Sequence, residues 1–241
     1  TLWDENTPEN ESSKVVIDFA NPSRAFRLPL GKAQGRRDQG ALWLTNTTIL
    51  AITQRAPATL QLIDVSGPAP RIVAEHPAPS QQFALSPDHK RVAFQLGEDL
   101  KNLSVEIYTL DPFSHVTTLA GASLGQDYFV PSDVWSRDGA RILATLDLCQ
   151  DTERLVAFDL ATGAQTELAR GGFMRFVFSP DGRWVAYTSF GTNAYVVSAD
   201  GKSPPQFVSD DVAAPFTPTW SQDSRYAAFQ ANFGGYDRCL I

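Results

Sequence analysis

Residues 176–187, FVFSPDGRWVAY, place a polar corner between two short apolar stretches. The SPDG corner, residues 179–182, suits the successive positions of a type I turn that ends in a left-handed residue, here Gly182. The residues on both sides are β-branched, aromatic or small, as in buried strands. The stretch therefore predicts a β-hairpin.

The same pattern recurs four more times along the chain. The other copies begin at residues 41 (ALWLTNTTILAI), 83 (FALSPDHKRVAF), 133 (DVWSRDGARILA) and 218 (PTWSQDSRYAAF). We take the serine of each corner as a marker, with Leu44 in the degenerate first copy. The markers of copies 1 to 5 then stand at positions 44, 86, 136, 179 and 221, spaced by 42, 50, 43 and 42 residues. Such regular spacing indicates a repeat architecture.

A second pair of strands is predicted after each of the first four corners. The segments are LQLIDVSGPAPRIVA, VEIYTLDPFSHVTTLA, RLVAFDLATGAQTELA and AYVVSADGKSPPQFVS, and each has the pattern strand, polar turn, strand. A unit of about 40 to 45 residues with four strands has the size of a propeller blade. We therefore expect an all-β propeller of four-stranded antiparallel blades that start near residues 41, 83, 133, 176 and 218. No segment keeps an apolar period of 3.6, so helices should be few.

The corner followed by a basic residue and VAF or VAY, together with VVSADGK and AFDLATG, resembles the WD40-like repeat called PD40. This repeat is found in TolB-type propellers and in the gating propellers of prolyl-oligopeptidase-type peptidases. The resemblance spans residues 41 to about 235. It implies a TolB-like β-propeller and an extracytoplasmic location, periplasmic or secreted. The repeat does not specify a function for the chain, because such folds serve many unrelated roles.

The ends of the chain leave the number of blades open. Residues 1–13 are polar and acidic, which predicts a flexible lead-in to a single propeller domain, residues 14–241. Residues 14–30 predict a hairpin from a partial or closing blade. That hairpin could complete a five-bladed ring, because closure removes unpaired strand edges. Alternatively, residues 236–241, YDRCLI, begin a strand of a six- to eight-bladed propeller that continues past Ile241, and this is the interpretation we favour.

Charge, hydrophobicity and cysteine positions limit the kinds of partner and cross-link that the chain is expected to have. The 241 residues carry a net charge of −7, which does not favour nucleic acid or other anionic partners, since phosphate contacts need clustered Lys and Arg. No apolar run approaches the roughly 18 residues of a membrane helix, so no membrane insertion is expected within this chain. Cys149 and Cys239 fall two blades apart in the repeat alignment, which predicts two thiols rather than a disulfide.

Neither a cofactor nor a metal nor a catalytic residue is expected. The three histidines, His76, His89 and His115, are scattered, whereas a zinc site needs three or four converging ligands. No catalytic serine elbow or glycine-rich phosphate loop is present. The corner aspartates should accept hydrogen bonds from amides of their own turns, and Gly182 should supply a left-handed backbone. The structural turn residues are therefore Asp88, Asp138, Asp181, Gly182 and Asp223.

Candidate binding residues stand just before the first strand of each blade, because these positions crowd around one mouth of a propeller channel. We take six polar residues there as the candidates: Asp38, Gln39, Gln82, Asp133, Arg175 and Thr217. Asp133 and Arg175 lie on neighbouring blades, so they could bind a polar group of a partner or could pair with each other.

Three functions from different classes follow. The first, which we favour, is a non-catalytic propeller that binds a protein or peptide partner or serves as an accessory ligand-binding domain. The second is a gating propeller for a prolyl-oligopeptidase-type catalytic domain outside this chain. The third is a carbohydrate-active propeller enzyme, which needs two carboxylates about 5 to 9 Å apart. Only Asp38 and Asp133 qualify for that role by position, and they belong to non-adjacent repeats.

Overall fold

The computed structural model describes residues 15–17, 25–28, 41–53, 57–80, 82–97, 102–125, 134–147, 152–189, 193–212 and 217–231. These residues form strands and turns, with no α-helix among them, which confirms the predicted all-β class. The chain divides into two compact units, Thr1–Gln82 (unit 1) and Phe83–Ile241 (unit 2). The predicted lead-in (residues 1–13) and the two cysteines lie outside the described residues. A single propeller domain over residues 14–241 stays a prediction.

Unit 1 contains one four-stranded antiparallel sheet and one hairpin. The sheet follows the chain in the order β3 (Ala41–Trp43), β4 (Thr48–Ile52), β5 (Thr59–Asp64) and β6 (Arg71–Pro77). The hairpin pairs β1 (Val15–Ile17) with β2 (Ala25–Arg27), within the predicted range of residues 14–30. A small apolar core joins the two, formed by Leu28, Ile49, Ala51, Ile63 and Val65, with Val16 and Ala41 packed against them.

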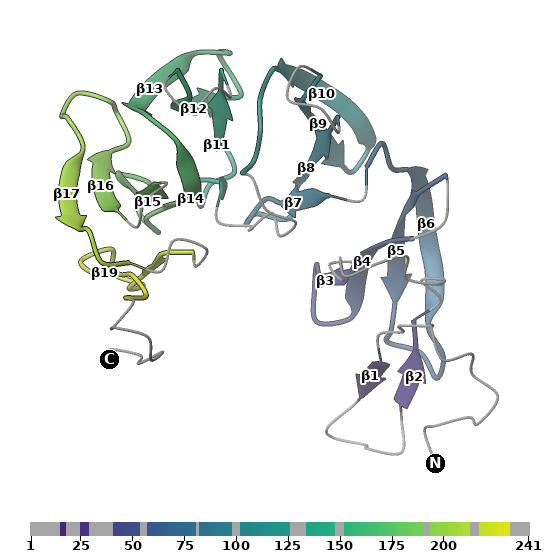
Figure 1. Ribbon diagram of the computed structural model, residues 1–241. Coiled ribbons are helices and arrows are strands. Elements are labelled where there is room, and N and C mark those ends of the chain that lie inside the picture. Colours follow the sequence, from purple (N-terminus) through teal and green to yellow (C-terminus); the bar gives the residue numbers. More distant parts are fainter. Residues whose placement is uncertain are drawn as a thin grey trace, which may run out of the picture. The chain divides into compact units, whose positions relative to one another are not determined.

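Unit 2 contains two complete four-stranded antiparallel sheets (Figure 1). The first has β7 (Phe83–Leu85), β8 (Arg91–Leu96), β9 (Ser104–Leu110) and β10 (Phe113–Ala120), and the second has β14 (Phe173–Phe178), β15 (Trp184–Ser189), β16 (Ala194–Ser198) and β17 (Gln206–Ser209). In both sheets the corner joins the first strand to the second, as predicted. The second of these sheets begins at Phe173 rather than residue 176, because a bulge between Phe173 and Arg175 lets β14 pair further along β15.

The remaining copies form smaller sheets. Copy 3 has β11 (Arg141–Leu146), β12 (Arg154–Asp159) and β13 (Gln165–Arg170), and an isolated bridge between Trp135 and Ile142 replaces its first strand. Copy 5 has only β18 (Thr219–Trp220) and β19 (Ala227–Ala228). Each repeat thus forms one antiparallel sheet in chain order, with four strands in copies 1, 2 and 4, and such sheets are typical of propeller blades.

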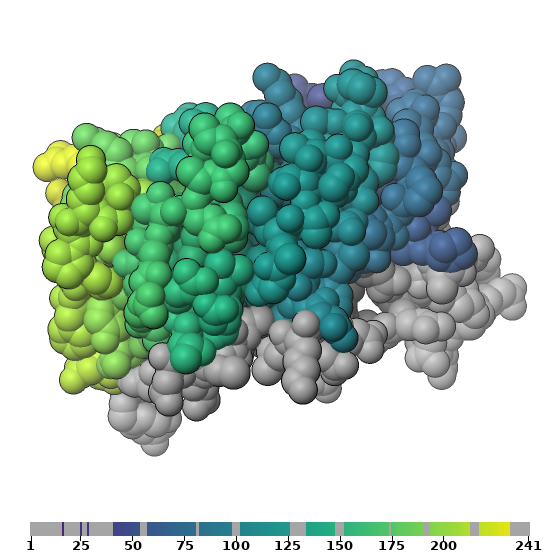
Figure 2. Space-filling model, turned by 90° about the horizontal axis from the view of Figure 1, so that it is seen from above, coloured from purple at the N-terminus to yellow at the C-terminus, as the bar shows by residue number. Residues whose placement is uncertain are grey.

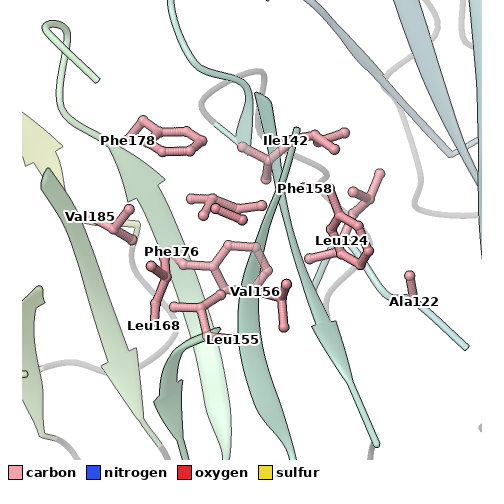
Figure 3. Close-up of a cluster of buried hydrophobic side chains, with 14 of the residues drawn as sticks. Ala122, Leu124, Ile142, Leu155, Val156, Phe158, Leu168, Phe176, Phe178 and Val185 are labelled. Carbon is pink, nitrogen blue, oxygen red and sulfur yellow. The ribbon is translucent and has the colours of Figure 1, made fainter. Parts of the chain in front are cut away.

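One apolar core joins the sheets of copies 2, 3 and 4 in unit 2. Figure 3 shows Phe176 and Phe178 of β14 in the same cluster as Ile142, Val156 and Phe158 of β11 and β12. All five side chains are at most 6% exposed. Because each sheet covers an apolar face of the next, the repeats stabilise one another.

Candidate binding site at the corner end of unit 2

Four corners, one from each of copies 2 to 5, share one set of hydrogen bonds. The marker hydroxyl donates to Oδ1 of the corner aspartate at 2.6 Å in Ser86–Asp88, Ser136–Asp138 and Ser179–Asp181, and at 2.7 Å in Ser221–Asp223. The same hydroxyl accepts the amide five residues later, at 2.8 to 3.0 Å. Each aspartate also accepts the amide two residues after it, at 3.0 to 3.1 Å. These contacts hold every corner in one shape.

The residue after each aspartate has a left-handed backbone. The φ angles are 58° at His89, 65° at Gly139, 68° at Gly182 and 60° at Ser224. Glycine adopts this conformation without steric cost, whereas other residues are strained there. Copies 2 and 5 therefore tolerate a strain that copies 3 and 4 avoid.

Three corner aspartates, Asp138, Asp181 and Asp223, have pKa values below the ordinary value of a carboxyl group. The Ser136 hydroxyl and the Ala140 amide lower the pKa of Asp138. Burial opposes ionisation of Asp181, but hydrogen bonds from Ser179 and Arg183 outweigh it and lower its pKa to about 2. Carboxylates with such pKa values are poor proton donors near neutral pH. Their hydrogen-bonding capacity is used inside their own turns.

Successive corners are joined by side chains. Arg91 Nη1 donates to the carbonyl oxygen of Gly139 at 2.9 Å, and Arg141 Nη2 donates to that of Gly182 at 2.5 Å. Between copies 4 and 5 the link is different, because the Asp181 amide donates to Ser224 Oγ at 2.9 Å. The four corners therefore lie in sequence at one end of unit 2, which we call the corner end.

A cavity of about 290 Å³ lies at the corner end. Residues just before the marker supply aromatic side chains to its lining: Trp135, Phe178 and Trp220. Residues just after the marker supply the rest of a ring of equivalent positions: Pro87, Arg137, Pro180 and Gln222. Equivalent positions from four repeats thus surround one space, which is the arrangement expected where the innermost strands of propeller blades meet.

The predicted mouth residues that the structure describes do not line this cavity. Asp38, Gln39 and Asp133 are outside the described residues, so no carboxylate pair can be assigned. Gln82 is half-buried and is the last residue of unit 1, and its amide donates to Ser80 Oγ. In unit 2, Arg175 is 8% exposed within β14 and pairs in register with Thr188, whereas Thr217 is exposed before β18. Neither lines the cavity, and a binding role for these residues remains a prediction.

The opposite end of unit 2 is built differently from copy to copy. Gln95, near the far end of β8, accepts the Leu124 amide at 2.7 Å and donates to the Ala122 carbonyl oxygen at 3.3 Å. In copy 3 a carboxyl group has the comparable role, because Glu153 Oε2 accepts the Phe173 amide at 3.2 Å. Glu153 is 1% exposed, and its burial raises its pKa. The Gln95 contacts hold the linker after β10, and the Glu153 contact holds the first residue of β14.

A second cavity, of about 330 Å³, lies between β10 and the sheet of copy 3. Leu119, Leu146, Phe158 and Leu160 contribute apolar side chains to its lining. In Figure 2 the outer parts of these two sheets, teal and green, lie side by side. Its described lining contains only one charged residue, Asp159, and this carboxylate already accepts the Thr162 amide and hydroxyl.

The sequence patterns did not predict that the residues after each marker serine line the cavity. The informative signal is variation: the position holds three residue types in four copies (Pro87, Arg137, Pro180 and Gln222), while the serine before it and the aspartate after it do not change. In a repeat protein, a variable position between two fixed ones is free of the structural constraint. The described residues contain neither a cluster of three potential metal ligands nor a helix with the length and apolar character of a membrane span.

Comparison with solved structures defines the class of fold. The chain is similar to TolB from Acinetobacter baumannii, with a TM-score of 0.51 and 17% sequence identity over 78% of this chain and 47% of TolB. It is also similar to an uncharacterized protein from Listeria monocytogenes EGD-e, with a TM-score of 0.52 and 10% identity over 73% of this chain and 56% of that one. The chain thus spans about half the length of these relatives.

No protein-family model matches the sequence, and no curated protein matches it. The structural similarity nevertheless shows that the chain has a TolB-like propeller fold, as the repeats predicted. At these identities the similarity concerns the fold alone.

Proposed function

We propose that this chain is a non-catalytic, TolB-like propeller that binds a protein or peptide partner at the corner-end cavity of unit 2. The observation that carries the proposal is the cavity itself, which is lined by equivalent positions of four repeats. Its lining combines aromatic and proline residues with four polar ones, Arg137, Ser179, Thr219 and Gln222. Apolar concave surfaces with a few polar groups are the usual form of binding sites.

Rigidity around the cavity supports the same proposal. The corner hydrogen bonds and the Arg91 and Arg141 links fix the backbone on which the lining residues stand. A site held in place before binding loses less conformational entropy when a ligand arrives. The carboxylates of the corners are engaged in their own turns, which favours binding over acid–base catalysis. The TolB-like resemblance further supports an extracytoplasmic location.

A peptide selection tests this function. Random peptides displayed on phage are selected on the full chain, and the enriched sequences are measured against two variants that carry the same substitution. Gln222→Trp narrows the cavity, whereas Gln206→Trp places the same side chain on the exposed outer strand β17. We expect Gln222→Trp to weaken binding at least about tenfold, as for loss of a central contact, and Gln206→Trp to leave it unchanged. Equal effects of the two variants, or no enriched peptide, would reject the proposal.

A further inference from the structure

The turn between β16 and β17 touches the preceding sheet, whereas the equivalent turn between β12 and β13 has open space beside it. Both turns hold a left-handed glycine, Gly163 with φ of 71° and Gly201 with φ of 67°. A Cβ at Gly201 would lie 2.8 Å from the carbonyl oxygen of Glu167 in β13. A Cβ at Gly163 would have no atom within 4 Å apart from its own chain neighbours. Gly163 instead lines the cavity of about 330 Å³ between β10 and the sheet of copy 3.

β10 borders this cavity and has a free edge. It is the last strand of its sheet, and β9 is its only partner among the strands that the structure describes. Just after β10, the Gly121 amide donates to the Leu103 carbonyl oxygen at 2.8 Å. Because ladder hydrogen bonds alternate along an antiparallel strand, the backbone groups of Thr118 and Ala120 point away from β9. Both residues are exposed, so backbone groups of another chain can reach them.

The chemistry of the cavity suits an uncharged apolar side chain. Leu119 and Leu160 are half-buried in its lining, and Leu146 and Phe158 are buried there. Asp159 is the only charged residue of the described lining, and its carboxylate accepts hydrogen bonds from its own turn. The volume lies at the small end of the roughly 300 to 1,000 Å³ of ligand sites, which favours one or two apolar side chains over a large ligand.

A strand added to the free edge of β10 would direct such side chains into the cavity. Thr117 and Leu119 are half-buried, and Leu119 packs against the core that includes the sheet of copy 3. Thr118 and Ala120, which alternate with them, are exposed. Directly opposite residues of neighbouring strands project their side chains to the same face of a sheet. Residues of an added strand that lie opposite Thr117 and Leu119 therefore face the cavity.

The length of the free edge selects a short segment as the occupant. Beyond the bulge between His115 and Thr117, β10 offers only residues 117–120. A pairing of this length buries far less than the roughly 1,200 to 2,000 Å² of a stable interface between folded proteins, so it would not hold a second copy of this chain. A small apolar molecule would leave the backbone groups of Thr118 and Ala120 without partners. An extended peptide satisfies both features, because its backbone pairs with the edge and its side chain fills the cavity.

We infer that the free edge of β10 and the adjoining cavity bind a short extended segment of a partner protein. The segment adds to the sheet of copy 2 as a fifth strand and places an apolar side chain between β10 and the sheet of copy 3. This site shares no described lining residue with the corner-end cavity. It is therefore a second binding site, which does not depend on the proposed function.

Four short peptides test the inference on the full chain. The probe is acetyl-Thr-Thr-Leu-Thr-Thr amide, and its polar match has asparagine in place of leucine. Two further versions of the probe carry backbone N-methyl groups, one on the second and fourth residues and the other on the leucine. These versions block opposite edges of the peptide, because successive residues of a strand direct their amides to opposite sides. Binding is followed at millimolar peptide through the Thr118 and Ala120 amide signals of the ¹⁵N-labelled protein.

The three comparisons have distinct expected results. The leucine peptide should shift both amide signals. The asparagine peptide should bind at least about tenfold more weakly, because it buries less apolar surface. Only one of the two N-methylated versions should bind, since only one edge of the peptide pairs with β10.

A pair of tryptophan variants supplies the control. Gln165 and Gln206 are the first residues of the equivalent outer strands β13 and β17, but only Gln165 belongs to the described lining of this cavity. Gln165→Trp should narrow the cavity and weaken binding of the leucine peptide about tenfold or more, as for loss of a central contact. Gln206→Trp should leave the binding unchanged.

Several results would overturn the inference. They are equal effects of the two tryptophan variants, equal binding of the leucine and asparagine peptides, binding of both N-methylated versions, and no shift of the Thr118 and Ala120 signals. A shift of these signals with protein concentration alone would also overturn it, because a second copy of the chain would then occupy the edge. Peptides bound at the corner-end cavity respond to Gln222→Trp instead, so this inference and the proposed function fail separately.

Discussion

The two ends of the strands in unit 2 differ in how side chains hydrogen-bond the backbone of the turns and linkers. At the corner end, a hydroxyl and a carboxylate satisfy the turn in every copy, with Oγ–Oδ1 distances that differ by only about 0.1 Å. At the opposite end, Gln95 of β8 holds the linker after β10, whereas Glu153, just before β12, holds the first residue of β14. The corner end therefore has the same hydrogen bonds in each copy, whereas the hydrogen bonds of the opposite end differ from copy to copy. Because the corner backbone is held by these shared hydrogen bonds, the residue after each marker can vary without changing the shape of the corner. The corner end is therefore better suited than the opposite end to bind a partner.

The largest effect should come from removing an aromatic anchor of the corner end. Trp135→Ala should destabilise the protein by about 3 to 5 kcal/mol, because it deletes a side chain that is 2% exposed. Trp135→Phe retains most of the apolar volume and loses only the bond to Ala84, so it should cost much less. Urea unfolding monitored by circular dichroism measures both. A loss below about 1 kcal/mol for the alanine variant would show that the anchor is not part of the cooperative core.

Two buried serines allow the ends to be compared directly. Ser136→Ala removes a hydroxyl that bonds Asp138 and the Arg141 amide at 2.6 and 2.8 Å, and should cost about 1 to 3 kcal/mol. Ser123→Ala, at the opposite end, removes only contacts to Gly125 at 3.2 and 3.3 Å and should cost less. Unfolding midpoints of the two variants decide the order. The reverse order would mean that the opposite end is the more rigid one.

At the left-handed position of the corners, one substitution should lower the stability of the protein and another should leave it unchanged or raise it. Gly182→Val should destabilise by about 1 kcal/mol or more, because φ is 68° and a Cβ would lie 3.1 Å from Arg141 Nη2. His89→Gly relieves the same strain in copy 2 and should be neutral or stabilising by up to about 1 kcal/mol. Thermal melting of the pair measures the difference. An unchanged midpoint for Gly182→Val would contradict a common corner geometry.

The smallest expected effect concerns pH at the opposite end. Because the pKa of Glu153 is raised in the folded protein, the folded state binds its proton more tightly than the unfolded state. Stability should therefore fall as pH rises from the ordinary value of 4.5 through the raised pKa. Glu153→Gln should flatten this dependence, since glutamine fills a comparable role in copy 2. Unfolding in urea at several pH values measures the slope, with the surface variant Glu167→Gln as the control. An identical slope in Glu153→Gln and wild type would place the titrating group elsewhere.

The contrast between the ends also explains what the sequence could predict. The corners, their aspartates and the order of strands follow from local turn chemistry and apolar patterning, which are visible within twelve residues. The start of β14 at Phe173 depends on a bulge, and the hydrogen bonds of Gln95 and Glu153 depend on how each linker crosses between sheets. Such contacts join residues about 20 to 30 positions apart, so no local pattern encodes them. The sequence does not predict the place of Arg137 and Gln222 in the cavity lining, because the expected channel mouth lies at the start of the first strands, whereas these two residues follow the marker serines.

Two of the three links between corners use an arginine side chain that reaches forward to the next copy. Arg91 of copy 2 reaches Gly139 of copy 3, Arg141 of copy 3 reaches Gly182 of copy 4, and Asp181 of copy 4 is bound by Ser224 of copy 5. Each blade is therefore braced by its successor. A gene duplication that inserted one more such unit would bring both an arginine for the unit ahead and a carbonyl for the unit behind, so the array could lengthen without redesigning either neighbour.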